Sequence, residues 1–146
     1  MARQGTGKPQ LISVIVPAYQ SGRTLATCMA ALMAQQWPNF EIIVVDSSPD
    51  DRVRAMVNAI APAARYYHSR ARLQSQAARN LGVTFASGEL LVFTDPDIYP
   101  PPDWLSQLVA VYQSLQGVVF GPIYCFGDRW VDRGVNLTKF HASYPP

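Results

Sequence analysis

The sequence predicts an α/β fold, a mainly parallel sheet with helices on both faces. Short apolar runs rich in β-branched residues alternate with longer segments whose apolar residues recur at helical spacing. Polar residues follow several of the short runs. In parallel sheets of this kind ligands bind beyond the carboxyl ends of the strands, so the residues after the short runs are the candidate site.

The first half of the chain predicts two pairs of a strand and a helix. Residues 11–16 are an apolar run closed by a proline, and residues 22–35 place apolar side chains three and four positions apart. Residues 41–45 are a second β-branched run that ends at Asp46, and residues 51–60 predict a second helix.

The second half continues this alternation. Residues 64–68 predict a short strand, residues 73–85 a helix, and residues 89–93 another strand. Residues 104–115 predict an amphipathic helix, and residues 117–126 predict a last strand.

The composition predicts one globular domain. The chain has 146 residues, of which 49% are hydrophobic and 15% charged, as in a compact protein rather than a disordered one. The net charge is only +2 and no basic run resembles a nucleic-acid tract, so we expect no nucleic acid partner. We expect a flexible N-terminus over residues 1–10, the folded domain over residues 11–127, and a C-terminal helix or tail over residues 128–146.

The two cysteines, Cys28 and Cys125, have neither metal-type spacing nor the density of a disulfide framework. They predict buried, small apolar side chains in a reducing compartment. The first apolar run is too short for a signal peptide, and no segment approaches the roughly 18 apolar residues of a membrane span. We therefore expect a soluble, cytoplasmic protein, and leave open a peripheral contact with the inner face of a membrane.

The segment LLVFTDPD ends an apolar run at two aspartates, Asp95 and Asp97. We expect residues 90–93 to be a strand buried on both faces. Pro96 favours extended backbone at Asp95, and residues i and i+2 of an extended chain point the same way, so the two carboxylates can converge. Carboxylates that close repel unless a cation lies between them, and Mg²⁺ or Mn²⁺ fits oxygen ligands. The alternative is a solvated loop whose aspartates begin a turn and cap the next helix.

Three groups of polar and aromatic residues follow predicted strands and would line one edge of the sheet. They are Pro17, Ala18 and Tyr19, then Asp46, Ser47 and Ser48, and then Asp95 and Asp97. Tyr19 can stack on a flat ring, and Asp46 can accept hydrogen bonds from a base or ribose. The alternatives are that Tyr19 is a partly buried turn residue and that Asp46 with Ser47 caps the second helix.

Three segments together resemble the family 2 glycosyltransferases of the GT-A fold. The segments are ISVIVPAYQSGRTLATCMAAL, then FEIIVVD with the SSPDD that follows it, and then AARNLGVTFASGELLVFTDPD. They occur in the family's order and at similar spacing, and the resemblance covers about residues 11–105. It implies a Rossmann-like half that binds a nucleotide diphosphate sugar through a divalent cation.

The resemblance implies roles for residues after the first two strands. Pro17, Ala18 and Tyr19 correspond to part of the nucleotide pocket. Asp46 corresponds to the acidic residue that contacts the nucleoside, and Ser48 in the same turn joins the predicted nucleotide-sugar site.

The resemblance also implies roles for residues later in the chain. Arg79 corresponds to a basic position beside the nucleotide, with a solvent-facing helix arginine as the alternative. Asp95 and Asp97 correspond to the Asp-x-Asp motif that holds Mg²⁺ or Mn²⁺ on the diphosphate. A cation there stabilises the negative charge that develops on the leaving diphosphate.

The chain departs from the family pattern in several places. Gln20 stands where Asn is frequent, an Asp-Ser-Ser-Pro run replaces a DDGS-like one, and Ile98 stands where a third acid is common. Family enzymes are usually longer, with an acceptor-binding half that supplies the catalytic carboxylate, so we expect a truncated chain. The carboxylates after Tyr99 are Asp103, Asp128 and Asp132. None lies in a sequence that resembles the family's base motif, so no catalytic residue is assigned.

The sequence therefore favours the donor-binding part of an inverting glycosyltransferase, with a UDP-sugar as donor and an unidentified hydroxyl acceptor. The alternative is a catalytically inactive nucleotide-binding or interaction module that retained the pocket. The segment PAYQSGRT does not resemble the Gly-rich phosphate loop of a nucleotidyltransferase, and the sequence contains neither a P-loop nor a G-x-G-x-x-G motif after a strand. Apolar surface left exposed by a missing half predicts self-association.

Overall fold

The computed structural model describes residues 10–115, 117–119 and 121. The sheet and the candidate site lie in the first of two units, Met1–Ser106. The predicted N-terminal segment other than Gln10, the predicted C-terminal helix or tail, Cys125 and most of the predicted strand over residues 117–126 lie outside the described residues.

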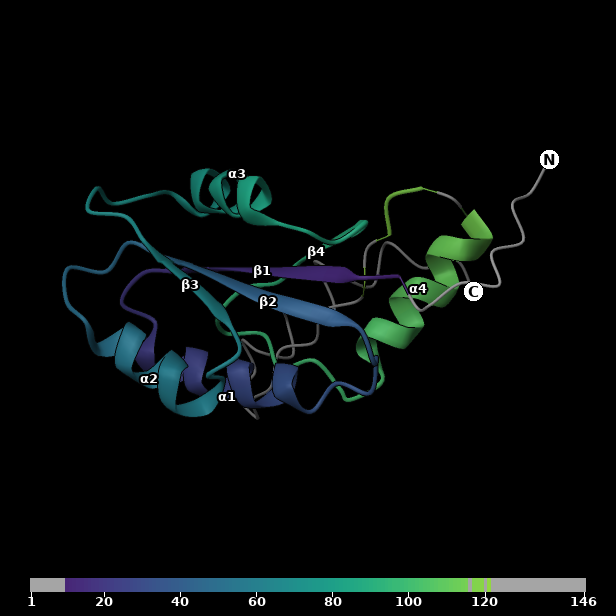
Figure 1. Ribbon diagram of the computed structural model, residues 1–146, viewed down its shortest axis with the longest axis horizontal. Coiled ribbons are helices and arrows are strands. Elements are labelled where there is room, and N and C mark those ends of the chain that lie inside the picture. The colour runs from purple at the N-terminus through teal and green to yellow at the C-terminus, as the bar shows by residue number, and fades with distance from the viewer. Residues whose placement is uncertain (1–9, 116, 120, 122–146) are drawn as a thin grey trace, which may run out of the picture. The chain divides into compact units, whose positions relative to one another are not determined.

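A parallel sheet of four strands, in the order β3-β2-β1-β4, forms the centre of this unit (Figure 1). The strands are β1 (Ile12–Ala18), β2 (Phe40–Asp46), β3 (Arg65–His68) and β4 (Leu90–Phe93). The helices are α1 (Gly22–Met33), α2 (Arg52–Ile60), α3 (Ser75–Phe85) and α4 (Trp104–Leu115). The predicted α/β fold class is confirmed.

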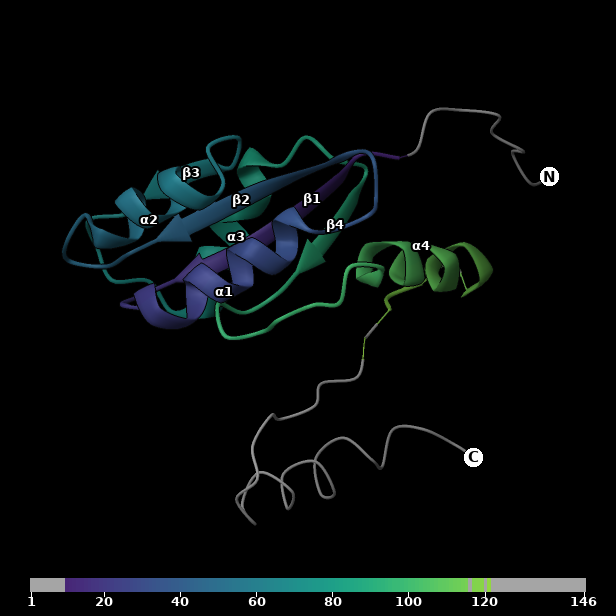
Figure 2. The same ribbon diagram turned by 90° about the horizontal axis from the view of Figure 1, so that it is seen from below.

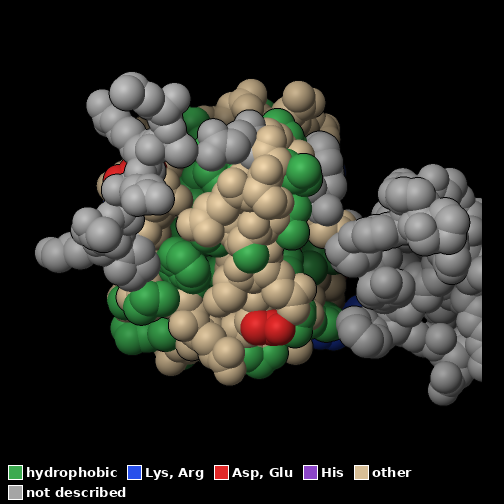
Figure 3. All heavy atoms as spheres, turned by 90° about the vertical axis from the view of Figure 1, so that its right-hand side faces the viewer, with side chains coloured by type: hydrophobic (Ala, Val, Ile, Leu, Met, Phe, Trp, Pro, Cys, Tyr) green, Lys and Arg blue, Asp and Glu red, His purple; other side chains and the backbone are tan. Residues whose placement is uncertain are grey.

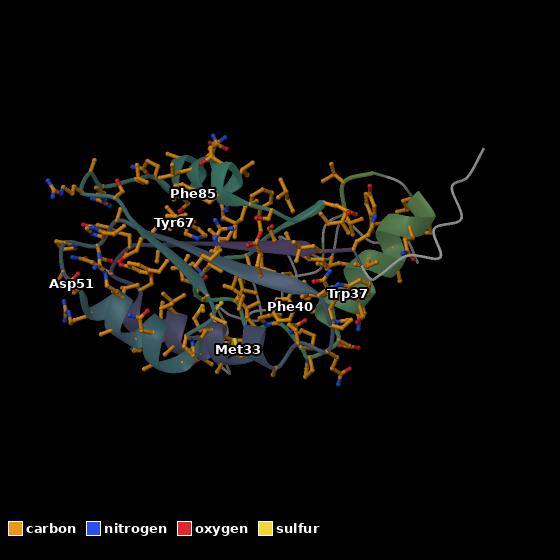
Figure 4. All side chains as sticks on the ribbon, viewed as in Figure 1. Met33, Trp37, Phe40, Asp51, Tyr67 and Phe85 are labelled. Atoms are coloured by element: carbon orange, nitrogen blue, oxygen red, sulfur yellow. The ribbon has the colours of Figure 1, made fainter. Side chains whose placement is uncertain are left out.

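Helices cover both faces of the sheet. In Figures 1 and 2, α1 and α2 lie side by side on one face and α3 lies on the other. Alternate residues of β1 and β2 are therefore buried against different helices, and Ile15 and Ile43 share a core cluster with Ala78 of α3. At the margin of this cluster the rings of Tyr67 and Phe85 stack with their centroids 3.7 Å apart (Figure 4).

The first strand extends further than predicted, because Pro17 does not close it. Pro17 pairs with Val45 and Ala18 with Asp46 in the β1–β2 register. The pairing of β1 with β4 ends earlier, at Ile15. Beyond that point β1 has a strand neighbour on one side only, where a residue without an N–H is tolerated. Pro17 and Ala18 therefore belong to β1, and both are buried.

The prediction that residues 90–93 are buried on both faces is wrong. Within the described part of the chain, β4 pairs only with β1 and is the edge of the sheet. Helix α3 packs on β1 and β2, and Leu91 and Phe93 of β4 are 41% and 45% exposed. An apolar run therefore marks the strand correctly but does not reveal that the strand lies at an edge.

Among the described residues, no helix has the length and apolar character that crossing a membrane requires. Figure 3 shows the face of the molecule at the right-hand side of Figure 1. Where described atoms are visible there, hydrophobic side chains and uncharged surface predominate and charged side chains are few.

Candidate functional site

The candidate site lies where the strands end. The loops after β1, β2 and β3 gather at the same end of the sheet, on the left in Figure 1, because all the strands are parallel. Tyr19, Asp46 and Asp95 each stand at or shortly after the carboxyl end of a strand. The first two predicted groups are joined, since Ala18 pairs with Asp46 and the Gln20 N–H bonds to Ser48, and the third group follows β4, the neighbour of β1.

Asp46 is fully buried and its carboxylate is enclosed by hydrogen bonds. Oδ1 accepts the backbone N–H of Ser48 at 2.8 Å and the Ser48 hydroxyl at 2.6 Å, and Oδ2 accepts the hydroxyl of Tyr66 at 2.5 Å. The N-cap residue of α2 is Asp51, which makes no side-chain capping bond. Asp46 therefore does not cap α2, and its side chain instead closes the turn after β2.

Tyr19 is partly exposed, and a cation covers its ring. The guanidinium carbon of Arg72, from the loop between β3 and α3, lies 4.4 Å from the ring centroid. The next residue, Gln20, has a φ of 49°, a left-handed conformation that costs energy for a residue with a Cβ. Its N–H donates to the Ser48 hydroxyl at 2.7 Å, which ties the turn after β1 to the turn after β2.

Asp95 forms an ion pair and a hydrogen bond with Arg79 of α3. Their side chains are 44% and 29% exposed, so Arg79 is not a purely solvent-facing helix arginine. The backbone after Asp95 is not extended as predicted, because the N–H of Ile98 bonds to the Asp95 carbonyl in a turn with Pro96 at its second position. Proline favours that position of the turn, and the extended conformation that it favours for Asp95 is compatible with the first position.

Both aspartates nevertheless lie near one side chain, Cys28 of α1. Burial raises the pKa of the Cys28 thiol to about 12, and the carboxylates of Asp97 and Asp95 contribute to the rise. A thiol with that pKa stays protonated at neutral pH, in agreement with the predicted buried, apolar role. Its sulfur lies 3.5 Å from the Asp95 carbonyl oxygen, which places α1 directly behind the turn.

The turn at Asp95 and Asp97 fits a divalent cation only if a bound ligand supplies further oxygen atoms. Across the described residues, no group of three or more His, Cys, Asp and Glu side chains is placed to hold a metal. Asp95 and Asp97 supply hard oxygen ligands, and Mg²⁺ or Mn²⁺ held by one or two carboxylates usually completes its shell with phosphate oxygens and water. The hydroxyl of Thr94, directly before Asp95, is buried without a hydrogen-bond partner.

Several predicted site residues do not present side chains to solvent. Pro17, Ala18 and Ser48 are buried, so a ligand at this edge would meet Tyr19, Arg79, Asp95 and Asp97 first. An open hollow of about 520 Å³ lies between the starts of α1 and α2. Its lining residues are Gln20, Gly22, Arg23, Asp50, Arg52 and Val53, none of which the sequence singled out for ligand contact.

Sequence reasoning missed two partners of the predicted residues, Tyr66 and Arg72. Tyr66 lies in β3 and Arg72 in the loop after it. The only signal was their position around the end of a predicted strand, since neither belongs to a recognisable motif.

The sequence matches a known family over most of its length. Residues 13–144 match the profile of Glycosyl transferase family 2. This chain belongs to that family. The uncharacterized glycosyltransferase YibD of Escherichia coli K12 is 33% identical over 129 residues. The match covers 82% of this chain but only 37% of YibD.

Solved glycosyltransferases share the fold. Mannosyltransferase PcManGT from Pyrobaculum calidifontis, solved with GDP-Man and Mn²⁺, matches with a TM-score of 0.63 and 27% identity over 89% of this chain and 39% of that one. Glucosyl-3-phosphoglycerate synthase from Mycobacterium tuberculosis, solved with Mn²⁺, UDP and glucosyl-3-phosphoglycerate, matches with a TM-score of 0.57 and 27% identity over 69% of this chain and 39% of that one. Both are GT-A enzymes, and the predicted GT-A fold is confirmed.

Proposed function

We propose that this chain is the donor-binding part of an inverting glycosyltransferase that binds a UDP-sugar with a divalent cation and transfers the sugar to a hydroxyl acceptor. Family membership alone does not establish this activity, because the chain spans only 37% of the length of YibD. A cytoplasmic location, with the membrane surface as one place of action, is part of the same proposal.

The observation that carries the proposal is the pairing of Asp95 with Arg79 at the carboxyl edge of the sheet. It puts an anionic ligand for a cation and a cationic ligand for phosphate side by side. The guanidinium matches phosphate oxygens, and the carboxylate would hold a divalent cation whose charge offsets that of the diphosphate. The solved relatives with GDP-Man and Mn²⁺, and with UDP and Mn²⁺, support this assignment.

The residues of this chain would then divide the work. Asp95 and Asp97 would hold Mg²⁺ or Mn²⁺, which supplies positive charge against the charge that develops on the departing diphosphate. Arg79 would contact the diphosphate, and Tyr19 would give its ring face to the base. Asp46 and Ser48, with the backbone of Pro17 and Ala18, would bound the nucleoside side of the pocket.

Calorimetric titration tests the proposal. We expect UDP to bind the 146-residue chain, and Mn²⁺ to strengthen binding by about tenfold, equivalent to about 1.4 kcal/mol. Asp95→Ala combined with Asp97→Ala should remove the gain from Mn²⁺ because both cation ligands are lost. GDP, titrated in parallel, tests the preference for uridine.

Asp51→Ala is the matched control, because it removes an exposed carboxylate at the start of α2 (Figure 4). Its Mn²⁺ gain should equal that of the wild type. Absence of UDP binding with and without Mn²⁺ would overturn the proposal. If UDP binds but no sugar is transferred, even when the remaining part of a full-length relative is added as a separate chain, the result would favour the inactive nucleotide-binding module.

A further inference from the structure

The carboxylate of Asp46 has no free face in this structure. The residue is 0% exposed, and its hydrogen bonds come from Ser48 on one oxygen and from Tyr66 on the other. A buried carboxylate needs such donors, since burial without them is costly. A nucleoside can reach Asp46 only if one of these donors gives up its place.

The two sources of hydrogen bonds differ in how easily they can be exchanged. Ser48 lies two residues after Asp46 in the same turn, and its hydroxyl also holds the N–H of Gln20. Withdrawing Ser48 would therefore dismantle the turns after β1 and β2. Tyr66 reaches the carboxylate from β3 with a side chain that rotates about two bonds.

The surroundings of Tyr66 allow that rotation. It is partly exposed, and β3 is the edge of the described sheet on its side. Its ring meets the guanidinium of Arg54 at 5.4 Å, a contact with an exposed side chain that can follow the ring. Burial and the bond to Asp46 raise the pKa of Tyr66, so its hydroxyl is a donor throughout the neutral range.

We propose that Tyr66 competes with the nucleoside for Asp46, because its hydroxyl occupies the position on Oδ2 that a ring N–H of the base takes. This inference rests on the proposed function. A base that carries a ring N–H donor, as uracil does, replaces one hydrogen bond to the carboxylate with another. A base without that donor displaces Tyr66 and leaves the buried oxygen unpaired, which is a strong basis for rejection.

Tyr66→Phe tests the exchange, because it removes the hydroxyl and keeps the ring. The free variant has an Oδ2 without its donor, and UDP restores one. We expect UDP to bind the variant about tenfold more tightly than the wild type, as a hydrogen bond to a charged group implies. The control probe is inorganic pyrophosphate, which has no base to displace Tyr66 and whose affinity should change less than about twofold. UDP methylated at N3 of uracil should bind both proteins more weakly than UDP does, because it leaves Oδ2 unpaired in each complex.

Tyr67→Phe is the matched control. It removes a hydroxyl from the next residue of β3, which accepts a hydrogen bond from Arg65 and points to the α3 face, where its ring stacks on Phe85 (Figure 4). We expect no change in UDP affinity. If Tyr66→Phe unfolds at a much lower temperature than the wild type, Tyr66→Met, which also lacks a donor, replaces it.

The outcomes separate this inference from the proposed function. No UDP binding by the wild type overturns both. If the wild type binds UDP and Tyr66→Phe weakens or does not change that binding, the inference alone fails. An equal gain for UDP and pyrophosphate would also overturn it, because the gain would not depend on the base.

Discussion

Three side chains that would contact a nucleotide sugar are already paired within the protein. Tyr19 lies under the guanidinium of Arg72. Asp95 pairs with Arg79, and the carboxylate of Asp46 is enclosed. A ligand at this edge would therefore exchange partners with protein side chains instead of filling bare surface, and its affinity would depend on what those partners lose.

The Arg79–Asp95 pair gives a first prediction of this kind. Arg79→Met keeps an unbranched side chain but removes the charge that competes with a cation for Asp95. We expect Mn²⁺ to bind the nucleotide-free variant about threefold to tenfold more tightly, because the loss of a nearby positive charge favours a second one. UDP should bind less tightly. Electron paramagnetic resonance of free Mn²⁺ measures the first effect without any turnover.

Arg52→Met is the matched control for Arg79→Met. Arg52 is an 84% exposed arginine that pairs with Asp50 at the start of α2. Its replacement removes the same formal charge from the chain. An equal rise in Mn²⁺ affinity in both variants would show that net charge, and not the pair with Asp95, is responsible.

The sequence could predict which residues stand at the ends of strands but not what they contact. Asp46 and Asp95 follow apolar runs, and parallel strands bring their ends together. Tyr66 contacts Asp46, and Arg72 contacts Tyr19, only because β3 pairs with β2, and strand order is not encoded in local periodicity. For the same reason the enclosure of Asp46 could not be foreseen.

At the scale of elements, α3 approaches the sheet closely at Gly82. A Cβ at this position would lie 2.5 Å from Ile15 Cγ2 and 3.3 Å from Val45 Cγ2. The missing side chain lets α3 sit directly on β1 and β2, and so helps to place Arg79 beside Asp95.

Gly82→Ala should therefore destabilise the chain despite the better helix propensity of alanine. Overpacking of a well-filled core costs about 1 to 3 kcal/mol. Denaturant unfolding measures the loss. Gly22→Ala at the start of α1, where no atom lies within 4 Å of the new Cβ, is the control and should be neutral or slightly stabilising. Equal effects of the two substitutions would refute the packing argument.

Glu41 joins several elements at the opposite end of the sheet. Its carboxylate accepts the Ser13 hydroxyl at 2.6 Å, the Ser87 N–H at 2.7 Å and Arg65 Nη1 at 2.9 Å. Burial acts to raise the pKa of Glu41, but the bonds from Ser13, Ser87 and Arg65 outweigh it and hold the pKa below its ordinary value of 4.5.

This shift predicts a pH-dependent loss of stability. A carboxylate whose pKa is lowered on folding stabilises the fold above its ordinary pKa, and the contribution disappears as the pH falls through the folded value. The difference in unfolding free energy between the wild type and Glu41→Gln should therefore be largest near neutral pH and shrink below 4.5. A constant difference for Glu41→Gln would contradict the prediction.

Element bounds were predictable where local chemistry decides them. Helix α4 begins and ends at the predicted residues, and α1 begins at Gly22 as predicted. The end of β1 was not predictable, because Pro17 is tolerated only where β4 no longer pairs with β1. The exposure of β4 likewise depends on which strands α3 covers, a tertiary fact absent from an apolar run.

At the scale of the whole molecule, the apolar edge of the sheet is a liability. Leu91 and Phe93 are exposed on β4, the edge strand of the described sheet. Exposed apolar side chains on a strand with unpaired backbone groups favour association with other chains.

Phe93→Glu should therefore increase the monomeric fraction of the chain, because a charge on an edge strand opposes pairing. Sedimentation velocity over a range of concentrations measures the effect. Met33→Glu on α1 is the matched control, since Met33 and Phe93 are both 45% exposed. A wild-type chain that is monomeric at all concentrations, or equal effects of both variants, would exclude association through β4.

The order of the strands also has a consequence for folding. The hydrogen bond between Ser13 and Glu41, across β1 and β2, spans 28 residues, whereas the bond between Ser13 and Gly88, where β4 begins beside β1, spans 75. Closing the longer loop costs more conformational entropy and slows the pairing that depends on it. We therefore expect the side of the edge that holds Tyr19 and Asp46 to form while β4 is still unpaired. The turn that holds Asp95 is then the last part of the site to assemble.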